Sequence, residues 1–342
     1  MRISMYYSNN DVRLEGMPIP KIGPGELLLK VETCGICGSD TMEWYRRDRV
    51  PLVLGHEIGA KVAKVGEGVE DYRVGDRITA AHHVPCNACY FCRSGHHTMC
   101  DTLRRTNFDP GGFSEYLRLP AINVDRGVFR LPDELSYEEA TFIEPLACVL
   151  RGQRQASIKS GQSVLIIGSG LTGLLHIRLA RTLGTRRVVA TDVSKFRLKA
   201  AKHSGADAVI NATEYSPECL RQINQNRLAD LVIVCTGATS ALNQALQSVE
   251  RGGTVLLFAP TAPGVTVALS VNDLFWRNDV TLTTTYAASP ADYAIAMELI
   301  RVKRVSVADM ISHRLGLTEA GDGFKLVAEA NNSLKVIIKP QE

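Results

Sequence analysis

The feature that most constrains the fold is an apolar run that leads directly into a glycine-rich turn, SVLIIGSGLTG at residues 163–173. A fully apolar run of this length is typical of a strand buried in a parallel sheet, and the next segment, LLHIRLARTLG, has helical spacing. The apolar runs RRVVATD, DAVIN, DLVIVCTG and GTVLLFA follow, and helical segments such as SKFRLKAAKHSG and SALNQALQSVERGG lie between most of them. This alternation predicts a doubly wound α/β domain with a parallel sheet.

The turn itself has the spacing Gly-x-Gly-x-x-Gly at Gly168, Gly170 and Gly173. Gly168 permits the tight turn, Gly170 lets the backbone approach a pyrophosphate, and Gly173 lets the helix and strand pack closely. The phosphates then lie at a helix N-terminus, where backbone N–H groups are free. Asp192 follows at the end of the next predicted strand, where a carboxylate accepts hydrogen bonds from both ribose hydroxyls and repels a 2′-phosphate. The pattern predicts an NAD site, with NADP less favoured.

The remaining candidates for contacting the dinucleotide are Leu171 and Thr172 in the turn, Arg197 in the next helical segment, and Thr236 after the strand DLVIVC. Arg197 leaves an alternative open, because a flexible arginine near the ribose can tolerate a phosphate. A second alternative is an ordinary sharp turn followed by an aspartate that caps a helix. The strand before the turn and the helix after it favour the cofactor.

The chain before this region has a different pattern. Residues 1–148 contain short β runs separated by glycine and proline, at 27–32, 58–65, 77–81 and 113–119, and little helical periodicity. We expect a compact, barrel-like β domain there. After residue 286 the chain continues through a helix, DYAIAMELIRVK, and ends in the strand-like KVIIK, and we expect this tail to join the first domain. The predicted domains are therefore 1–148 with 287–342, and 149–286.

Four of the nine cysteines lie close together in PCNACYFCRSGHHTMC, residues 85–100. They could form disulfides, a nucleic-acid-binding zinc finger, a catalytic metal site or a structural staple. Four thiolates close a tetrahedral zinc shell and leave no position for substrate, so such a site is structural. The four predicted ligands of this structural zinc are Cys86, Cys89, Cys92 and Cys100.

Composition narrows these alternatives. The chain has 342 residues, 45% of them apolar, which is enough for two packed cores, and its formal net charge of +3 supports no polyanionic partner. The N-terminal segment lacks the apolar core of a signal peptide, and no apolar run reaches the ~20 residues of a membrane helix. We therefore expect a cytoplasmic protein that binds neither nucleic acid nor membrane. In that reducing compartment, clustered cysteines bind metal more often than they form disulfides.

If zinc also carries out chemistry, its ligands must lie elsewhere and leave one position open. GICGSD supplies Cys37, with Ser39 and Asp40 just behind it, and LGHE supplies His56 and Glu57. Taken singly, each of these residues is more often structural: a buried cysteine, a core histidine or a surface glutamate. Their occurrence with the four-cysteine segment and the dinucleotide turn favours a second, catalytic metal site.

With these motifs in place, the chain resembles the zinc-dependent medium-chain dehydrogenases, specifically their polyol (sorbitol or L-iditol) and threonine dehydrogenase branch. The resemblance covers essentially the whole length. It depends on GICGSD, VLGHEIGAKVAKVGEGV, YRVGDRI, the four cysteines, GGFSEY, EPLACVL and GSGLTG. It implies an α/β protein with a GroES-like β-barrel catalytic domain, a Rossmann domain, and two zinc ions with NAD as the cofactors.

The resemblance also implies the catalytic zinc ligands. Cys37 and His56 match two of them, and Glu144 of EPL is in the position where the polyol branch has glutamate. Cys148, four residues later, is a weaker candidate for the same role. Glu57 resembles the acidic neighbour that can move toward the metal, so we expect it as a further ligand and catalytic group.

The implied proton path begins at Ser39, while Asp40 resembles the residue that orients His56. The next member of the family's path is commonly a histidine, but this chain has Met42 there, and a thioether carries no proton at neutral pH. Glu43 or a chain of waters would have to replace it.

The implied activity is NAD-dependent oxidation of a secondary alcohol or polyol to the ketone. Sorbitol-type enzymes pair an arginine with a tyrosine near the end of the Rossmann domain, but this chain has Thr285 before Tyr286. The loss of that arginine leaves the individual substrate open. The alternatives are L-threonine 3-dehydrogenase and a non-catalytic sensor on the same fold. The resemblance also implies a homo-oligomer, a tetramer or a dimer.

Overall fold

The computed structural model describes residues 1–342, which divide into two compact units. Unit 1 comprises Met1–Ala147 and Ala287–Glu342, and unit 2 comprises Cys148–Tyr286. The sequence placed the first boundary one residue later. None of the helices combines the length and the apolar content that a membrane span requires.

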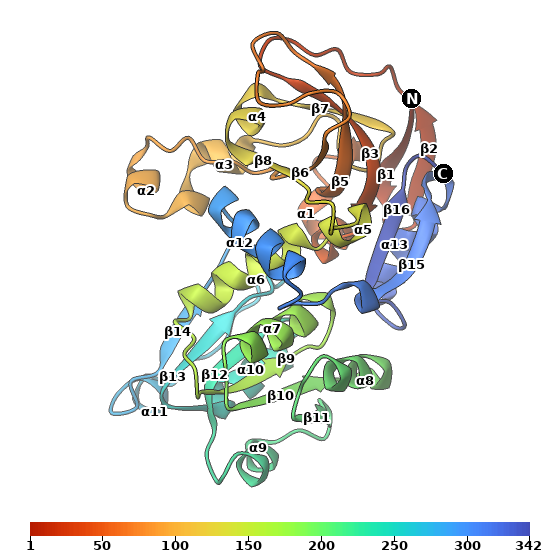
Figure 1. Cartoon of the computed structure of the whole chain (residues 1–342). Helices are drawn as coiled ribbons and strands as arrows, with labels where there is room; N and C mark the ends of the chain where they lie inside the picture. Colours follow the sequence, from red (N-terminus) through yellow and green to blue (C-terminus); the bar gives the residue numbers. More distant parts are fainter. The chain divides into compact units, whose positions relative to one another are not determined.

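Unit 1 is built on a seven-stranded sheet with the strand order β15-β16-β3-β5-β6-β8, and β7 pairs with β3 beside it. Only β15 and β16 run parallel, and the other pairs are antiparallel. The strands are β3 (Leu27–Gly35), β5 (Glu57–Val65), β6 (Arg77–Ala80), β7 (Tyr116–Leu119), β8 (Val128–Arg130), β15 (Ile311–Gly316) and β16 (Lys335–Lys339). The C-terminal strand β16 therefore lies between β15, at one edge of the sheet, and β3 (Figure 1).

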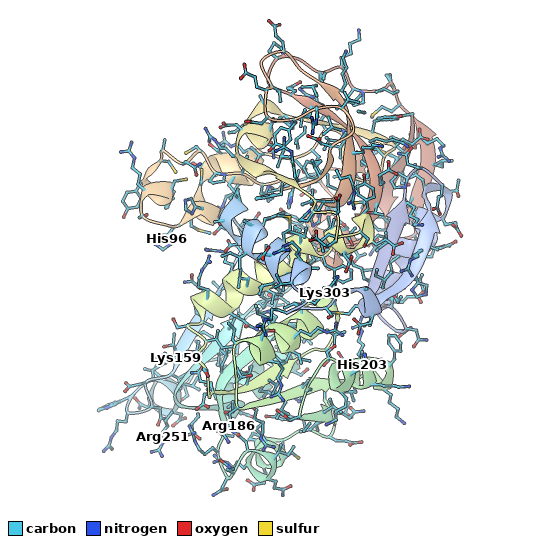
Figure 2. All side chains as sticks on the ribbon, viewed as in Figure 1. His96, Lys159, Arg186, His203, Arg251 and Lys303 are labelled. Carbon is cyan, nitrogen blue, oxygen red and sulfur yellow. The ribbon has the colours of Figure 1, made fainter.

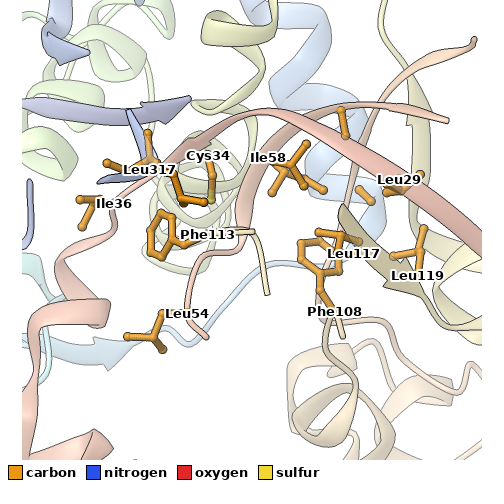
Figure 3. Close-up of a cluster of buried hydrophobic side chains, with 14 of the residues drawn as sticks. Leu29, Cys34, Ile36, Leu54, Ile58, Phe108, Phe113, Leu117, Leu119 and Leu317 are labelled. Atoms are coloured by element: carbon orange, nitrogen blue, oxygen red, sulfur yellow. The ribbon is translucent and has the colours of Figure 1, made fainter. Parts of the chain in front are cut away.

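A smaller sheet in unit 1 has the order β2-β1-β4 and joins β1 (Arg2–Ser8), β2 (Asp11–Gly16) and β4 (Leu52–Val53). The core of the unit contains Leu29, Cys34, Ile58, Phe113 and Leu117, all fully buried (Figure 3). The tail contributes Phe324 and Ile338 to the same core. The C-terminal residues are thus part of the hydrophobic core of unit 1.

The helices of unit 1 are mostly short, which explains the weak helical periodicity of its sequence. They are η1 (Gly38–Thr41), α1 (Glu43–Arg46), α2 (Tyr90–Arg93), η2 (His97–Met99), α3 (Asp101–Arg105), α4 (Ala121–Gly127), α5 (Tyr137–Ala140), α12 (Pro290–Arg301), η3 (Ala308–Met310), η4 (Leu317–Glu319) and α13 (Ala320–Glu329). Helix α6 (Ile143–Gln155) begins in unit 1 and ends in unit 2.

Unit 2 is a parallel sheet of six strands in the order β11-β10-β9-β12-β13-β14. The strands are β9 (Ser163–Ile167), β10 (Arg187–Asp192), β11 (Ala208–Asn211), β12 (Ala229–Val234), β13 (Val249–Leu257) and β14 (Thr281–Thr284). The helices are α7 (Leu171–Thr182), α8 (Lys195–His203), α9 (Pro217–Ile223), α10 (Thr239–Ser248) and α11 (Val271–Leu274). The strand order reverses between β9 and β12, which is the switch point of a doubly wound sheet.

Candidate metal centres and cofactor site

The four clustered cysteines lie in a lobe, Pro85–Arg105, which extends from the sheets of unit 1 (Figure 1). Their sulfur atoms lie within 4.8 Å of one another, with 3.6 Å between Cys89 and Cys92 and 3.9 Å between Cys86 and Cys92. A tetrahedral zinc with Zn–S bonds of about 2.3 Å requires sulfurs about 3.8 Å apart. All nine cysteines of the chain are free of disulfides. The four residues fit a closed zinc site.

Backbone N–H groups surround these sulfurs. The N–H of Ala88 and that of Cys89 point at Cys86 Sγ, at 3.4 and 3.2 Å, and these two bonds lower the pKa of the Cys86 thiol. Burial opposes the same effect at Cys100, but hydrogen bonds from Cys86 and Leu103 prevail and lower its pKa to about 6. The loop therefore favours the thiolate, the form that binds metal, at Cys86 and Cys100, whereas burial raises the pKa of Cys92 to about 12. His96 lies on the exposed surface of the lobe and is not part of this cluster (Figure 2).

A second set of potential ligands gathers where β3 ends and β5 begins. Cys37 follows β3, His56 precedes β5, and Glu57 is its first residue, opposite Gly35 of β3. Their ligand atoms lie within 4.8 Å of one another. One thiolate, one imidazole and one carboxylate are a donor set suited to zinc, and three protein ligands leave a fourth position open.

Asp40 organises this second set. Its Oδ1 lies 3.5 Å from His56 Nδ1, and its Oδ2 accepts a hydrogen bond from the backbone N–H of Cys37. With Nδ1 facing the carboxylate, Nε2 of the ring is left for a metal. Burial alone would lower the pKa of His56, but the charge of Asp40 and its hydrogen bond raise the pKa well above the ordinary value. At Cys37, burial raises the pKa of the thiol. Because a metal binds the thiolate and the neutral imidazole, metal binding at this site must release protons.

Glu57 is held by a residue that sequence analysis missed. Lys335 Nζ of β16 donates to Glu57 Oε2 over 2.5 Å, and the two side chains are 0% and 1% exposed. The other carboxylate oxygen, Oε1, is buried and has no hydrogen-bond partner. Gly35 leaves room for the pair, because a Cβ there would overlap both side chains. The only sequence signal for Lys335 is a lysine directly before the apolar run VII, residues 336–338.

The other predicted residues of this site are less closely gathered. Glu144 is 8% exposed in the first turn of α6 and is not among the residues whose ligand atoms gather, so its role as a ligand stays a prediction. Cys148 is partly buried in the same helix. Ser39 lies in η1, where its N–H points at Cys37 Sγ over 3.4 Å. Glu43 accepts a hydrogen bond from the backbone of Asn9, which does not support it as the next member of a proton path.

A pair of histidines next to the second set was also missed. The ring centroid of His82 lies 4.7 Å from that of His56 and 3.9 Å from that of His83. Burial, followed by the neighbouring His83, His56 and Arg46, lowers the pKa of His82 well below its ordinary value, so the ring is neutral at physiological pH. The sequence signal is the pair of histidines directly before the cysteine lobe.

The dinucleotide turn lies at the carboxyl end of β9, in unit 2. Gly168 has a φ of 94°, which favours glycine, and a Cβ on Gly173 would overlap the carbonyl oxygen of Gly168. Gly170 is the N-cap of α7, whose first two residues are Leu171 and Thr172. Thr236 follows β12 and packs against Gly168. The turn thus presents backbone N–H groups at a helix N-terminus, as a pyrophosphate requires.

Asp192 ends β10 and accepts backbone hydrogen bonds from Ser169 and Ser194, each of 2.8 Å. Each bond uses one oxygen, so both oxygens retain a lone pair for a ribose hydroxyl. The guanidinium of Arg197 lies over Gly170, with Nη1 3.7 Å from the position a Cβ would take. The turn therefore combines a fixed carboxylate with a nearby cation. Thr285 and Tyr286 lie after β14, and Tyr286 is 42% exposed.

The chain is similar to known proteins over most of its length. Residues 23–133 match the alcohol dehydrogenase GroES-like domain, and residues 172–301 match the zinc-binding dehydrogenase domain. Sorbitol dehydrogenase of Mus musculus is 32% identical over 96% of this chain and 93% of its own length.

Two solved structures have the same fold over 99% of both chains. Alcohol dehydrogenase TADH from Thermus sp. ATN1 is 29% identical, with a TM-score of 0.86. A chain described as a zinc-binding dehydrogenase from Sinorhizobium meliloti 1021, solved with NADP, is 28% identical, with a TM-score of 0.87. The predicted fold class, a GroES-like domain with a Rossmann domain, is confirmed. The chain belongs to the zinc-dependent medium-chain dehydrogenase family and is an oxidoreductase of the alcohol and polyol dehydrogenase class.

Proposed function

We propose that the chain oxidises a secondary alcohol of a polyol or diol to the ketone, with NAD as the hydride acceptor and one catalytic and one structural zinc. The observation that carries this proposal is the gathering of Cys37, His56 and Glu57 within 4.8 Å, with Asp40 beside the imidazole. The likeness to sorbitol dehydrogenase of Mus musculus supports the polyol class. When bound, zinc acts as a Lewis acid on the alcohol oxygen, and NAD accepts the hydride.

The roles of the protein's own residues follow from their positions. Cys37, His56 and Glu144 are the proposed ligands, Asp40 fixes the tautomer of His56, and Glu57 is an exchangeable ligand whose free Oε1 can turn toward the metal. Cys86, Cys89, Cys92 and Cys100 hold the structural zinc.

The test is zinc content per chain together with NADH formation from a panel of polyols, vicinal diols and L-threonine. We expect two zinc ions per wild-type chain, and one in Cys37→Ser with activity abolished. Cys219→Ser is the matched control, because Cys219 lies in unit 2 and bonds to Ser216, far along the chain from both zinc sites. One zinc in both wild type and Cys37→Ser, with no NADH, would contradict the proposal and favour a non-catalytic protein. Preferred oxidation of threonine would instead identify threonine 3-dehydrogenase.

We propose NAD rather than NADP because Asp192 would repel a 2′-phosphate. The preference between NAD and NADP should be measured, because a related structure was solved with NADP and the cation of Arg197 lies near Gly170. We expect wild type to prefer NAD, and Asp192→Ser to lose that preference by about 10–100-fold in the ratio of kcat/KM values, since a hydrogen bond to a charged group contributes about 1.5–3 kcal/mol. A wild-type preference for NADP would contradict the assignment.

We propose that Ser39 takes the proton from the substrate and passes it to water, since Met42 carries no proton and Glu43 is bonded to Asn9. Turnover of Ser39→Ala measured against pH tests this step, and unchanged turnover would remove Ser39 from the path. We also propose a homo-oligomer, a tetramer or dimer, in the reducing cytoplasm. Light scattering that finds a monomer would refute the assembly.

A further inference from the structure

His82 is a buried imidazole that has no hydrogen bond. It lies two residues after β6, is 9% exposed, and its ring is tilted 44° to that of His56. Nδ1 is completely buried without a partner, and no hydrogen bond reaches Nε2 either. An unsatisfied buried polar group costs about 1–3 kcal/mol, so a ring held in this way is expected to have a ligand.

The hydrogen bonds of the neighbouring groups show that the missing hydrogen bond of His82 is not caused by a loosely packed segment. The backbone carbonyl of His82 accepts a hydrogen bond of 3.0 Å from Asn123, so the main chain is fixed. The adjacent His83 has its Nδ1 2.8 Å from the carbonyl oxygen of Thr106. Of two consecutive histidines, the one beside the metal ligands is therefore the one left unbonded.

The proposed metal ligands, Cys37, His56 and Glu144 with Glu57 as the exchangeable one, are complete without His82. The His82 ring is also not part of the group in which Cys37, His56 and Glu57 bring their ligand atoms within 4.8 Å of one another. The reacting alcohol oxygen belongs with those ligands, and the centroid of the His82 ring lies 4.7 Å from that of the His56 ring.

We infer that His82 determines specificity by donating a hydrogen bond to a second hydroxyl, on the carbon adjacent to the one that is oxidised. Because Nδ1 is covered and has no acceptor, we assign the donating N–H to Nε2, the nitrogen at the outer end of the ring. An alcohol without the second hydroxyl leaves this donor unpaired, which disfavours it. The inference rests on the proposed oxidation of polyols and diols and adds to it the residue that recognises the second hydroxyl.

The test compares propane-1,2-diol with propan-2-ol, which differ by that one hydroxyl. For the purified zinc-containing protein we would measure kcat/KM with NAD, and the affinity of each alcohol for the protein with NADH by calorimetry. In His82→Phe we expect both values to fall about 2–12-fold for the diol, the equivalent of one neutral hydrogen bond, and to change less than twofold for propan-2-ol. His82→Gln, which keeps an N–H donor near the position of Nε2, should recover part of the loss.

His83→Asn is the matched control, because the amide can keep the bond to Thr106 and no selective effect on the diol is expected. Equal losses for both alcohols, or a fall in zinc content, would show that His82 supports the metal ligands and would overturn the inference. An unchanged ratio in His82→Phe, or no diol binding by wild type, would also overturn it. Binding of the diol that weakens in His82→Phe without any NADH would refute the proposed function alone.

Discussion

Lys335 offers the sharpest test of how the catalytic unit is built. Its ammonium group is fully buried and has Glu57 as its ion-pair partner, and it lies 5.2 Å from the centroid of the Phe142 ring. Replacing Lys335 with methionine keeps the volume of the side chain but leaves the Glu57 carboxylate buried without a counter-charge. Breaking a buried pair in this way costs about 3–5 kcal/mol, because the remaining charge has lost both water and partner.

That loss corresponds to a fall in the melting temperature of about 6–20 °C for a unit of this size. The loss should depend on metal. In chelator-treated Lys335→Met, the carboxylate has no alternative partner, whereas in the zinc-loaded protein its free Oε1 can turn toward a cation held by Cys37 and His56. We therefore expect the larger loss of stability in the metal-free protein.

The assay is thermal and urea unfolding of wild type and Lys335→Met, each with zinc and after chelation. The double variant Glu57→Gln/Lys335→Met is the control, because it removes both charges and should recover most of the loss. A loss below about 1 kcal/mol in Lys335→Met, or a double variant as unstable as the single one, would refute the argument that an unpaired charge is responsible. Equal losses with and without zinc would refute the movement of Glu57.

Three further outcomes are expected. Gly173→Ala places a Cβ against the carbonyl of Gly168, so the turn must open, and we expect the Kd for NADH by fluorescence to rise at least tenfold while zinc content is unchanged. Burial lowers the pKa of His176 to about 3, so the folded state excludes a proton that the unfolded chain binds below pH ~6.5. Stability in urea is therefore complete above that pH and falls by up to roughly 5 kcal/mol toward pH 3, and His176→Leu should flatten this part of the profile; parallel profiles would contradict the assignment. Cys100→Ser should remove one zinc and make the lobe sensitive to protease, while a cobalt spectrum of the Cys37 site stays unchanged.

The parallel sheet of unit 2 could be predicted from sequence because its signals are local. Each apolar run from SVLIIG to GTVLLFA became a strand of this sheet. One boundary was wrong: the segment SALNQALQSVERGG was expected to be helical throughout, but α10 ends at Ser248 and β13 begins at Val249. No glycine or proline separates the two elements there, so the sequence has no stop signal, and pairing of Ala229 with Val249 fixes the start of the strand.

Unit 1 was less predictable because its elements are short and joined by pairings distant in sequence. The strand expected from residue 113 begins only at Tyr116, since Phe113 and Ser114 turn into the core and bond to neighbouring loops. Strands β1 and β2 were missed altogether, as were helices of four to seven residues, which span too few turns to show a period.

The candidate metal ligands were found from sequence because each lies in a compact motif of its own. The residues that pack against these ligands, Lys335 and His82, were not predicted. Lys335 and Glu57 are 278 residues apart in sequence. His82 is of interest only because the fold packs its ring against that of His56 and leaves its Nδ1 without a hydrogen bond. Charge pairing across a sheet and the absence of a hydrogen bond are properties of the folded chain, and neither leaves a pattern in the sequence.

The distance in sequence between Glu57 and Lys335 also orders events during synthesis. A ribosome adding about 5–20 residues per second needs about 15–55 s to reach Lys335 after Glu57 has been made. During that interval all of unit 2 is translated, while β16, the strand that lies beside β3, is still missing. The Glu57 carboxylate therefore has no buried counter-charge until Lys335 has been added, and a chain truncated before Lys335 can complete its nucleotide-binding unit but not its metal-binding one.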